Sequence, residues 1–243
     1  MKLSVIIPAF NEQLELPGCL NLVQQVFATV TAERPSLSWE LIVTDNNSTD
    51  DTAEIAKAAG AKVIFEPVNQ IARARNAGAS EATGDWFLFI DADSQLHIDS
   101  IREMLSAIDS AQVGAGGCLV RMDDAPQWGK LGIGIWNTLS RTLNWAAGSF
   151  VFCRADAFRE VGGFDEEYYA AEELYFSQAV KKWCKERKLR FVVLRRQPHA
   201  SSSRKFRIYS NAEILRLIRN VFFSYGKTVK SPKALDFFYD GRR

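Results

Sequence analysis

The sequence predicts a single α/β domain built on a mainly parallel, Rossmann-like sheet with helices on both faces. Three observations support this fold class. Short apolar runs alternate with longer segments of helical periodicity along the chain. Hydrophobic residues make up 47% of the 243 residues and charged residues 24%, which is sufficient for a substantial core. No internal repeat, low-complexity tract or linker divides residues 1–243.

Each element is predicted from its own pattern. Apolar runs that end at proline or at polar residues predict strands over 3–8, 40–45, 62–66, 86–91, from 113 onward and over 189–194. Apolar stripes predict helices over 14–30, from about 49 to 59, and over 71–82, 98–108, 172–187 and 212–225. The segment 128–145 is rich in aromatic residues and glycine, and its pattern fits both a helix and a lid-like loop.

Polar residues follow several of the predicted strands. They are Asn11, Glu12, Asp45, Asn46, Asp91 and Asp93. In open parallel sheets, ligands bind beyond the carboxyl ends of the strands. We therefore expect these side chains to gather on one rim of the sheet and to form the functional site there.

Asp91 and Asp93 close the most apolar run of the chain, Trp86–Ile90. If the strand continues through them, residues two apart point to the same side and the two carboxylates converge while Ala92 turns away. Converging carboxylates repel unless a cation lies between them, and hard oxygen ligands suit Mg²⁺ or Mn²⁺. The alternative is that both aspartates cap the helix that begins near Ile98.

Composition and charge indicate which kinds of partner and which cellular location to expect. A formal net charge of +1 argues against nucleic-acid binding by bulk electrostatics. The four cysteines are scattered without a C-x-x-C pair, which is typical of reduced thiols. No signal peptide is evident, and polar residues interrupt the most apolar long segment, 131–153. We expect a cytoplasmic protein, free or held peripherally at the inner face of the membrane. The basic stretch 195–207 fits a phosphate or anionic-lipid contact, and equally a solvated surface.

A series of motifs spans most of the chain. They are SVIIPAFNE at 4–12, IVTDNNSTDDT at 42–52, ARARNAG at 72–78, ATGD at 82–85, FIDAD at 89–93, and VGGFDE at 161–166 followed by Glu172-Glu173-Leu174. In this order and spacing they resemble family 2 glycosyltransferases of the GT-A fold. The resemblance implies a nucleotide-binding half over 1–120, an acceptor half over 121–225 and a tail over 226–243. We expect the tail to pack on the domain, to form a homodimer or to touch a membrane.

The resemblance implies a nucleotide-sugar donor, with a UDP-sugar favoured. Its nucleotide-binding residues would be Pro8, Phe10, Glu12, Asp45, Arg75 and Asp91. A carboxylate at Asp45 can accept a hydrogen bond from a uracil N–H, which agrees with this role. Without the resemblance, Asp45 is equally read as a turn-forming residue before Asn46-Asn47, and Arg75 as part of an exposed helix face.

The resemblance also implies a divalent cation, Mn²⁺ or Mg²⁺, bound by Asp93 and Asp91. The cation would stabilise the charge on the departing nucleoside diphosphate. His199 is a candidate third ligand, and the alternative for it is an ordinary loop residue.

Glu172 and Glu173 align with the acidic pair of this family, which supplies the base that deprotonates the acceptor hydroxyl. The family match favours Glu173 as the base, although the usual residue at that position is aspartate. The alternative is two acidic residues favoured by the helix dipole. Direct displacement by the acceptor would invert the anomeric carbon.

The function predicted from these residues is metal-dependent, inverting transfer of one sugar per encounter, in cell-surface glycan or glycolipid synthesis. The acceptor would be a saccharide, a lipid-linked molecule or a small molecule. A Q-x-x-R-W motif, typical of processive members, is absent from the sequence. Two alternatives remain. One is a nucleotidyltransferase, although the turn after the first strand lacks the usual glycine and lysine; the other is a non-catalytic domain that binds nucleotide sugars.

Overall fold

The computed structural model describes residues 1–146, 149–202, 208, 210, 213 and 228–230. The helix predicted over 212–225 and most of the tail over 226–243 lie outside the described residues. Within the tail, Thr228–Lys230 forms a short 3-10 helix, and the backbone N–H of Tyr169 donates a hydrogen bond to the carbonyl oxygen of Val229 at 2.7 Å.

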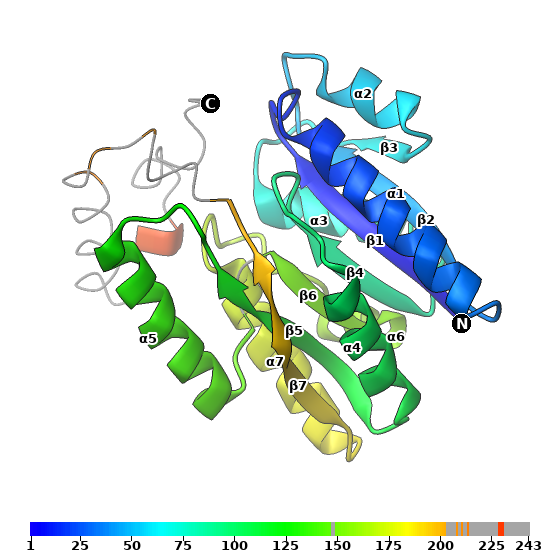
Figure 1. Cartoon of the computed structure of the whole chain (residues 1–243), viewed down its shortest axis with the longest axis vertical. Coiled ribbons are helices and arrows are strands. Elements are labelled where there is room, and N and C mark those ends of the chain that lie inside the picture. The colour runs from blue at the N-terminus through cyan, green and yellow to red at the C-terminus, as the bar shows by residue number, and fades with distance from the viewer. Residues whose placement is uncertain (147–148, 203–207, 209, 211–212, 214–227, 231–243) are drawn as a thin grey trace.

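The described residues form a seven-stranded sheet with the order β3-β2-β1-β4-β6-β5-β7 (Figure 1). The strands are β1 (Lys2–Ala9), β2 (Ser38–Asp45), β3 (Lys62–Phe65), β4 (Trp86–Ile90), β5 (Val113–Arg121), β6 (Phe150–Arg154) and β7 (Arg190–Ala200). Strands β3, β2, β1 and β4 are parallel to one another, as are β5 and β7, and β6 is antiparallel to both of its neighbours. The predicted mainly parallel sheet is therefore confirmed.

Helices connect the strands and cover the sheet. They are α1 (Leu16–Glu33), α2 (Thr52–Ala58), α3 (Ile71–Ser80), α4 (Ile98–Asp109), α5 (Gln127–Leu143), α6 (Ala155–Val161) and α7 (Glu172–Glu186). The ambiguous segment 128–145 is thus mostly helix. The sequence patterns did not reveal β6 and α6, because these short elements follow one another directly with no turn signal between them.

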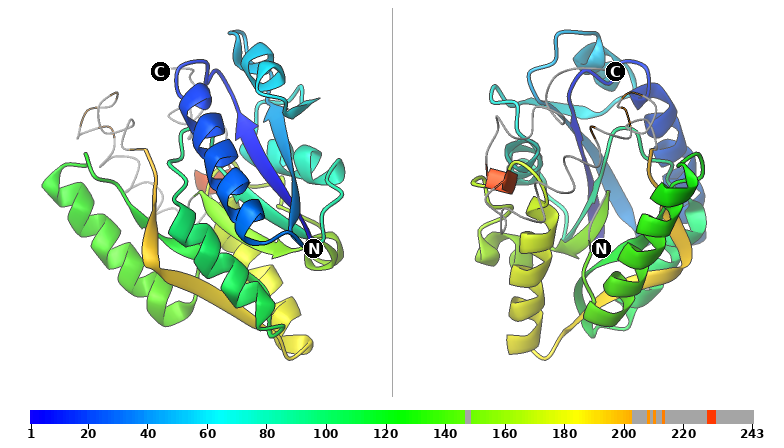
Figure 2. Two further views of the ribbon diagram at one scale, coloured as in Figure 1. Left: turned by 45° about the vertical axis from the view of Figure 1, so that its right-hand side comes forward. Right: turned by 90° about the vertical axis from the view of Figure 1, so that its left-hand side faces the viewer.

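Alternate residues of the central strands face two separate cores. Val5 and Ile7 pack into the core under α1 and α4, whereas Ile6 packs into the core under α3, α6 and α7. The views in Figures 1 and 2 show these two helical layers on opposite faces of the sheet. Burial on both faces explains why β4, which reads WFLFI, is apolar at every position.

Helix α3 approaches the sheet closely at Gly78. A Cβ atom at this position would lie 2.6 Å from both Ile6 Cγ2 and Thr44 Oγ1. Glycine is therefore required for the helix to pack directly on β1 and β2, which fixes the position of Arg75 one turn earlier. Among the described residues, no helix combines the length and apolarity needed to cross a bilayer.

Candidate active site

The carboxyl ends of β1 and β2 lie side by side, because Ala9 pairs with Asp45 in the parallel register. The loop after β1 consequently meets the loop after β2. Asn11, with φ of 51°, accepts a hydrogen bond at its Oδ1 from the backbone N–H of Thr49 at 2.8 Å. Its own backbone N–H donates to Ser48 Oγ at 3.0 Å, and that of Glu12 donates to Thr52 Oγ1 at 2.8 Å. The predicted gathering of polar residues at this end of the sheet is present.

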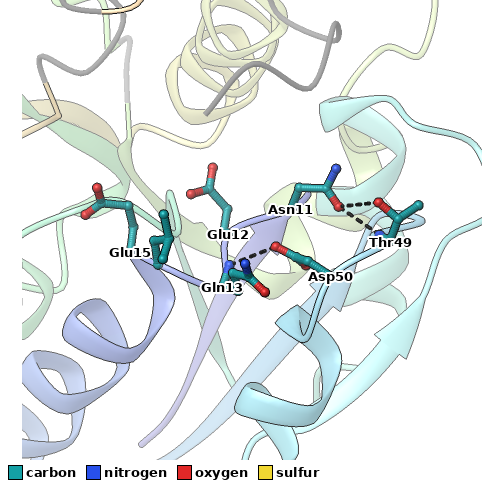
Figure 3. Close-up of a pocket in the computed structure, with 7 residues that line it drawn as sticks. Asn11, Glu12, Gln13, Glu15, Thr49 and Asp50 are labelled. Carbon is teal, nitrogen blue, oxygen red and sulfur yellow. Dashed lines mark hydrogen bonds between the residues drawn. The ribbon is translucent and has the colours of Figure 1, made fainter.

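A cavity of about 220 Å³ opens between these two loops (Figure 3). It is lined by Asn11, Glu12, Gln13, Leu14, Glu15, Thr49 and Asp50. Figure 3 shows the carboxylates of Glu12 and Glu15 extending away from the contact between Asn11 and Thr49. The cavity thus offers acidic and amide groups held on a hydrogen-bonded loop pair.

The residues expected to hold a nucleoside lie around this loop pair. Pro8 is buried in β1, Phe10 is partly buried, and Glu12 and Asp45 are 8% and 7% exposed. Asp45 Oδ1 accepts a hydrogen bond from the backbone N–H of Ser48 at 3.0 Å. Asp45 therefore forms a turn, which was the alternative interpretation of its position in the sequence. This turn lies at the rim of the sheet.

Asp91 and Asp93 lie in a turn and not on a strand. Strand β4 ends at Ile90, and the backbone N–H of Ser94 donates to the carbonyl oxygen of Asp91 at 3.1 Å. The strand periodicity expected for the pair is therefore wrong, although Ala92 is buried and both aspartates are partly exposed.

Neither aspartate caps the following helix. The N-cap of α4 is His97, whose Nδ1 accepts a hydrogen bond from the backbone N–H of Asp99 at 3.2 Å. The charges of the two aspartates act instead on a thiol behind the turn. Burial, together with Asp93 and Asp91, raises the pKa of Cys19 to about 12. The two carboxylates thus create a negative field at the rim.

Arg75 connects this turn to the acceptor half of the chain. Its guanidinium donates to Asp91 Oδ1 at 2.9 Å through Nη2 and to Glu172 Oε1 through Nη1. The side chains of Arg75 and Glu172 are 4% and 3% exposed. Burial opposes the charge on Arg75, but Glu172 and Asp91 outweigh it and raise its pKa. The exposed helix face considered for Arg75 is therefore wrong, and Arg75 is a buried cation between two acids.

The two adjacent glutamates of α7 have different surroundings. Ala171 precedes them with φ of 60°, and Glu172 is buried against Arg75 while Glu173 is partly exposed. Burial and the neighbouring Glu173 raise the pKa of Glu172, and Arg75 opposes this shift. The first helical turn thus carries one acid committed to an ion pair and a second one that reaches the surface.

His199 is fully buried near the same rim. It lies on β7 opposite Val120 of β5, with its ring centroid 5.3 Å from that of Phe150. Burial lowers the pKa of His199 to about 4, and the charge of Asp91 opposes this shift. Within the described part of the chain, neither ring nitrogen has a hydrogen-bond partner. The lowered pKa favours the neutral imidazole, whose one unprotonated nitrogen is suited to accept a ligand.

The side chains of the described residues do not form a closed metal cage on their own. Among the residues that the structure describes, no group of three or more His, Cys, Asp or Glu side chains is close enough to hold a metal ion. The neutral His199 and the acidic turn at Asp91 and Asp93 are nevertheless of the ligand types that Mn²⁺ accepts.

The hydrogen bonds through which Asn46, Gln70 and Asn76 join the two halves were not predicted from the sequence, although Asn46 was expected at the rim. Asn46 accepts a hydrogen bond from the backbone N–H of Gln70 at 2.8 Å, and Gln70 Nε2 donates to the carbonyl oxygens of Glu166 and Tyr168 at 2.6 and 3.1 Å. Asn76 exchanges two hydrogen bonds with the backbone of Phe164, at 2.8 and 2.9 Å. Asn46 and Asn76 lie inside the motifs, which was the available signal, but the partners of Gln70 and Asn76 in the acceptor half are 88 to 98 residues away and cannot be read from local pattern.

Comparison with known proteins identifies the family to which the chain is related. The family model described as "Glycosyl transferase family 2" matches residues 4–162. An uncharacterised glycosyltransferase of Rickettsia typhi is 37% identical over 95 residues, which cover 39% of this chain and 29% of that protein. The dolichol-phosphate mannosyltransferase of Pyrococcus furiosus is 31% identical over 137 residues, which cover 53% of this chain and 36% of that protein. In both cases the match covers less than half of the relative's length.

Solved structures share the fold at low sequence identity. A mannosyltransferase of Pyrobaculum calidifontis in complex with GDP-Man and Mn²⁺ has a TM-score of 0.67 at 19% identity, over 96% of this chain and 64% of that one. The glucosyl-3-phosphoglycerate synthase of Mycobacterium tuberculosis has a TM-score of 0.62 at 17% identity, over 92% and 80%. These likenesses confirm the GT-A fold. With the family model matching more than half of its residues, the chain belongs to glycosyl transferase family 2.

Proposed function

We propose that the protein is a metal-dependent, inverting glycosyltransferase that moves a sugar from a nucleotide donor to an acceptor hydroxyl. The observation that carries this proposal is the chain Asp91–Arg75–Glu172. It links the acidic turn at the rim of the sheet to the first turn of α7 through a buried guanidinium. The acidic turn and the helix that carries Glu173 are thereby held next to each other.

The nucleotide-binding half, residues 1–120, would hold the donor. The residues around the loop pair are Pro8, Phe10, Glu12 and Asp45. One carboxylate oxygen of Asp45 accepts the hydrogen bond of the turn, and the carboxylate stays near the rim. UDP is the favoured nucleoside diphosphate. Structural neighbours were solved with UDP, with GDP-Man and with UDP-glucose, so both nucleosides belong in the test.

Asp93 and Asp91 would hold the divalent cation together with oxygens of the donor diphosphate, with His199 as a candidate third ligand. Two observations support His199: it lies on β7 near this rim, and its buried ring nitrogens have no hydrogen-bond partner in the described chain. Mn²⁺ or Mg²⁺ would neutralise charge that develops on the departing diphosphate. Arg75 holds Asp91 in place and is a positioning residue for it.

Glu173 would be the base. Glu172 is engaged with Arg75 and buried, so its carboxylate is not free to meet an acceptor hydroxyl. Glu173 is the next residue of the same helical turn and is partly exposed. A carboxylate there would accept the proton of the acceptor hydroxyl as the oxygen attacks the anomeric carbon.

The acceptor half, residues 121–225, would receive a saccharide, a lipid-linked molecule or a small molecule, in cell-surface glycan or glycolipid synthesis. Two curated relatives carry names that refer to lipid-linked acceptors, the P. furiosus dolichol-phosphate mannosyltransferase and a dolichyl-phosphate β-glucosyltransferase of Trichomonas vaginalis. These names make polyprenyl phosphates the first acceptors to test.

The test is release of nucleoside diphosphate from a panel of UDP-, GDP- and dTDP-sugars, with Mn²⁺ or Mg²⁺ and with polyprenyl phosphate or saccharide acceptors. We expect acceptor-dependent release that EDTA abolishes and that Asp93→Ala removes. Asp109→Ala, an exposed acid at the far end of α4, is the matched control. Release of pyrophosphate from nucleoside triphosphates would instead show a nucleotidyltransferase. Donor binding without any turnover would show a non-catalytic domain.

A further inference from the structure

Helix α5 exposes a line of large apolar side chains, here called the apolar stripe. It consists of Leu131, Ile135, Leu139 and Leu143, which are 67%, 57%, 41% and 39% exposed. Residues four apart lie on the same side of a helix, so these four side chains form one continuous strip. At about 1.5 Å per residue, the strip is about 18 Å long.

The opposite side of α5 is attached to the sheet. Asn137 Nδ2 donates to the carbonyl oxygen of Val120 at 2.8 Å, and its Oδ1 accepts from the backbone N–H of the same residue at 3.1 Å. Gly129 and Ser140 are buried on this side. Figures 1 and 2 show α5 on the outside of the molecule, beside the edge strand β7. The apolar stripe therefore faces away from the domain.

Basic side chains surround the C-terminal end of the stripe. Arg195 of β7 donates to the carbonyl oxygen of Arg141 at 3.2 Å, and Lys181 of α7 donates to that of Leu143. Lys130 is exposed near the other end. Acids are also present: Asp123 and Asp124 are exposed before the helix, and Glu103 accepts from the backbone N–H groups of Arg195 and Arg196. Lys181 and Arg195 thus bring two cations to the last turn of α5, the end at which Leu139 and Leu143 lie.

We propose that this face of α5 binds the surface of an anionic lipid bilayer, with the helix lying in the plane of the interface. An apolar strip with a basic border matches the two layers of such a surface, because acyl chains accept the strip and anionic headgroups accept the cations. The binding needs neither donor nor acceptor, so it is independent of the proposed transfer reaction.

The test is flotation of the full chain with vesicles of phosphatidylcholine, with and without phosphatidylglycerol. We expect binding to the anionic vesicles that weakens as salt rises. The variant Leu131→Gln/Ile135→Gln/Leu139→Gln should bind at least about tenfold more weakly, because three apolar anchors are lost. Arg141→Gln/Arg195→Gln should weaken only the salt-sensitive part. Phe65→Gln replaces a side chain that is 61% exposed on β3, at the opposite edge of the sheet, and should bind like the wild type.

Each other outcome would overturn the proposal. Equal binding to both kinds of vesicle, or no binding to either, would show that this face does not bind an anionic lipid surface. If the wild type sediments as a dimer that the triple variant dissociates, the stripe is an interface between copies of this chain. If hydrogen exchange shows α5 protected without vesicles and exposed after truncation at residue 202, the chain's own C-terminal segment covers it. Should the triple variant fail to fold by circular dichroism, Leu131→Gln alone supplies the comparison.

Discussion

Arg75 of α3 and Glu172 of α7 form an ion pair between two nearly fully buried side chains that are 97 residues apart in the sequence. Arg75 also binds Asp91 at the end of β4. One guanidinium therefore fixes the distance between the acidic turn and the helix that carries Glu173. We expect removal of the Arg75 guanidinium to lower both stability and activity, and separate measurements distinguish the two effects.

Replacing Arg75 by Met should destabilise the protein by about 3–5 kcal/mol, because a buried carboxylate is left without its cation. Urea unfolding measures this loss. The double variant Arg75→Met/Glu172→Leu removes the buried charge together with its partner and should recover much of the stability. A loss of less than about 1 kcal/mol in the single variant would mean that the pair does not hold the two elements together.

Glu173→Gln should lower kcat by about 10²–10⁴-fold while leaving the unfolding midpoint unchanged, because a general base is lost from a partly exposed position. Steady-state kinetics with saturating donor give the value. Glu172→Gln is the matched neighbouring variant and should retain at least about tenfold more activity than Glu173→Gln. The reverse order of the two variants would assign the base to Glu172.

His199→Ala should raise the Mn²⁺ concentration required for half-maximal activity by about 10–100-fold, if its buried nitrogens bind the ion as proposed. The control is His97→Ala, since the chain has two histidines and His97 caps α4 on the surface. Manganese titration of both variants after EDTA treatment measures the shift. Identical titrations for wild type and His199→Ala would exclude His199 as a ligand.

Glu40 makes stability depend on acid pH. Burial raises the pKa of Glu40, but hydrogen bonds from Ser4, Thr83 and Lys2 outweigh it and lower the pKa to about 2. Because its pKa is lower in the folded state, ionised Glu40 stabilises the native state at pH values above the ordinary glutamate pKa of 4.5. This stabilisation is lost as the pH falls from there toward 2. Glu40→Gln should therefore cost about 1–2 kcal/mol at pH 7 and much less at pH 3. A loss of equal size at both pH values would contradict this assignment.

Gly78→Ala should destabilise the protein by about 1–3 kcal/mol, because the new methyl group would meet Ile6 and Thr44 at 2.6 Å. Gly18 of α1 is the matched control, since a Cβ there meets nothing within 4 Å. Gly18→Ala should be neutral or stabilising by up to about 1 kcal/mol. Thermal unfolding of the two variants compares them directly; equal effects would refute the close packing of α3.

The sequence predicted the elements whose pattern is long enough to repeat. α1, α4 and α7 were found because their apolar periodicity reflects burial directly, and β1, β2 and β4 because continuous apolar runs end at proline or polar residues. β6 and α6 were missed because each is short and they follow one another without a turn signal. Helix α5 was left open between helix and loop for a different reason. Its glycines weaken the helical pattern, and its exposed side carries apolar residues where polar ones are usual.

The candidate site was predictable as a set of residues and not as a geometry. Strand ends and motifs located Asp45, Asp91 and Glu172 on one rim. The role of Arg75 could not be read from its helix, because the partners that bury it lie in the turn after β4 and on α7. The turn at Asp91 was likewise hidden, since an apolar run does not show the residue at which the strand stops.

The most direct test of the central claim is calorimetric binding of UDP, GDP and dTDP to the wild type and to Asp93→Ala, each with and without Mn²⁺. We predict that one nucleotide binds the wild type at least about tenfold more tightly with Mn²⁺, and that this gain disappears in the variant. Nucleotide binding of equal strength with and without the metal, or a gain that survives in Asp93→Ala, would contradict the account of a metal-dependent donor site at this edge of the sheet.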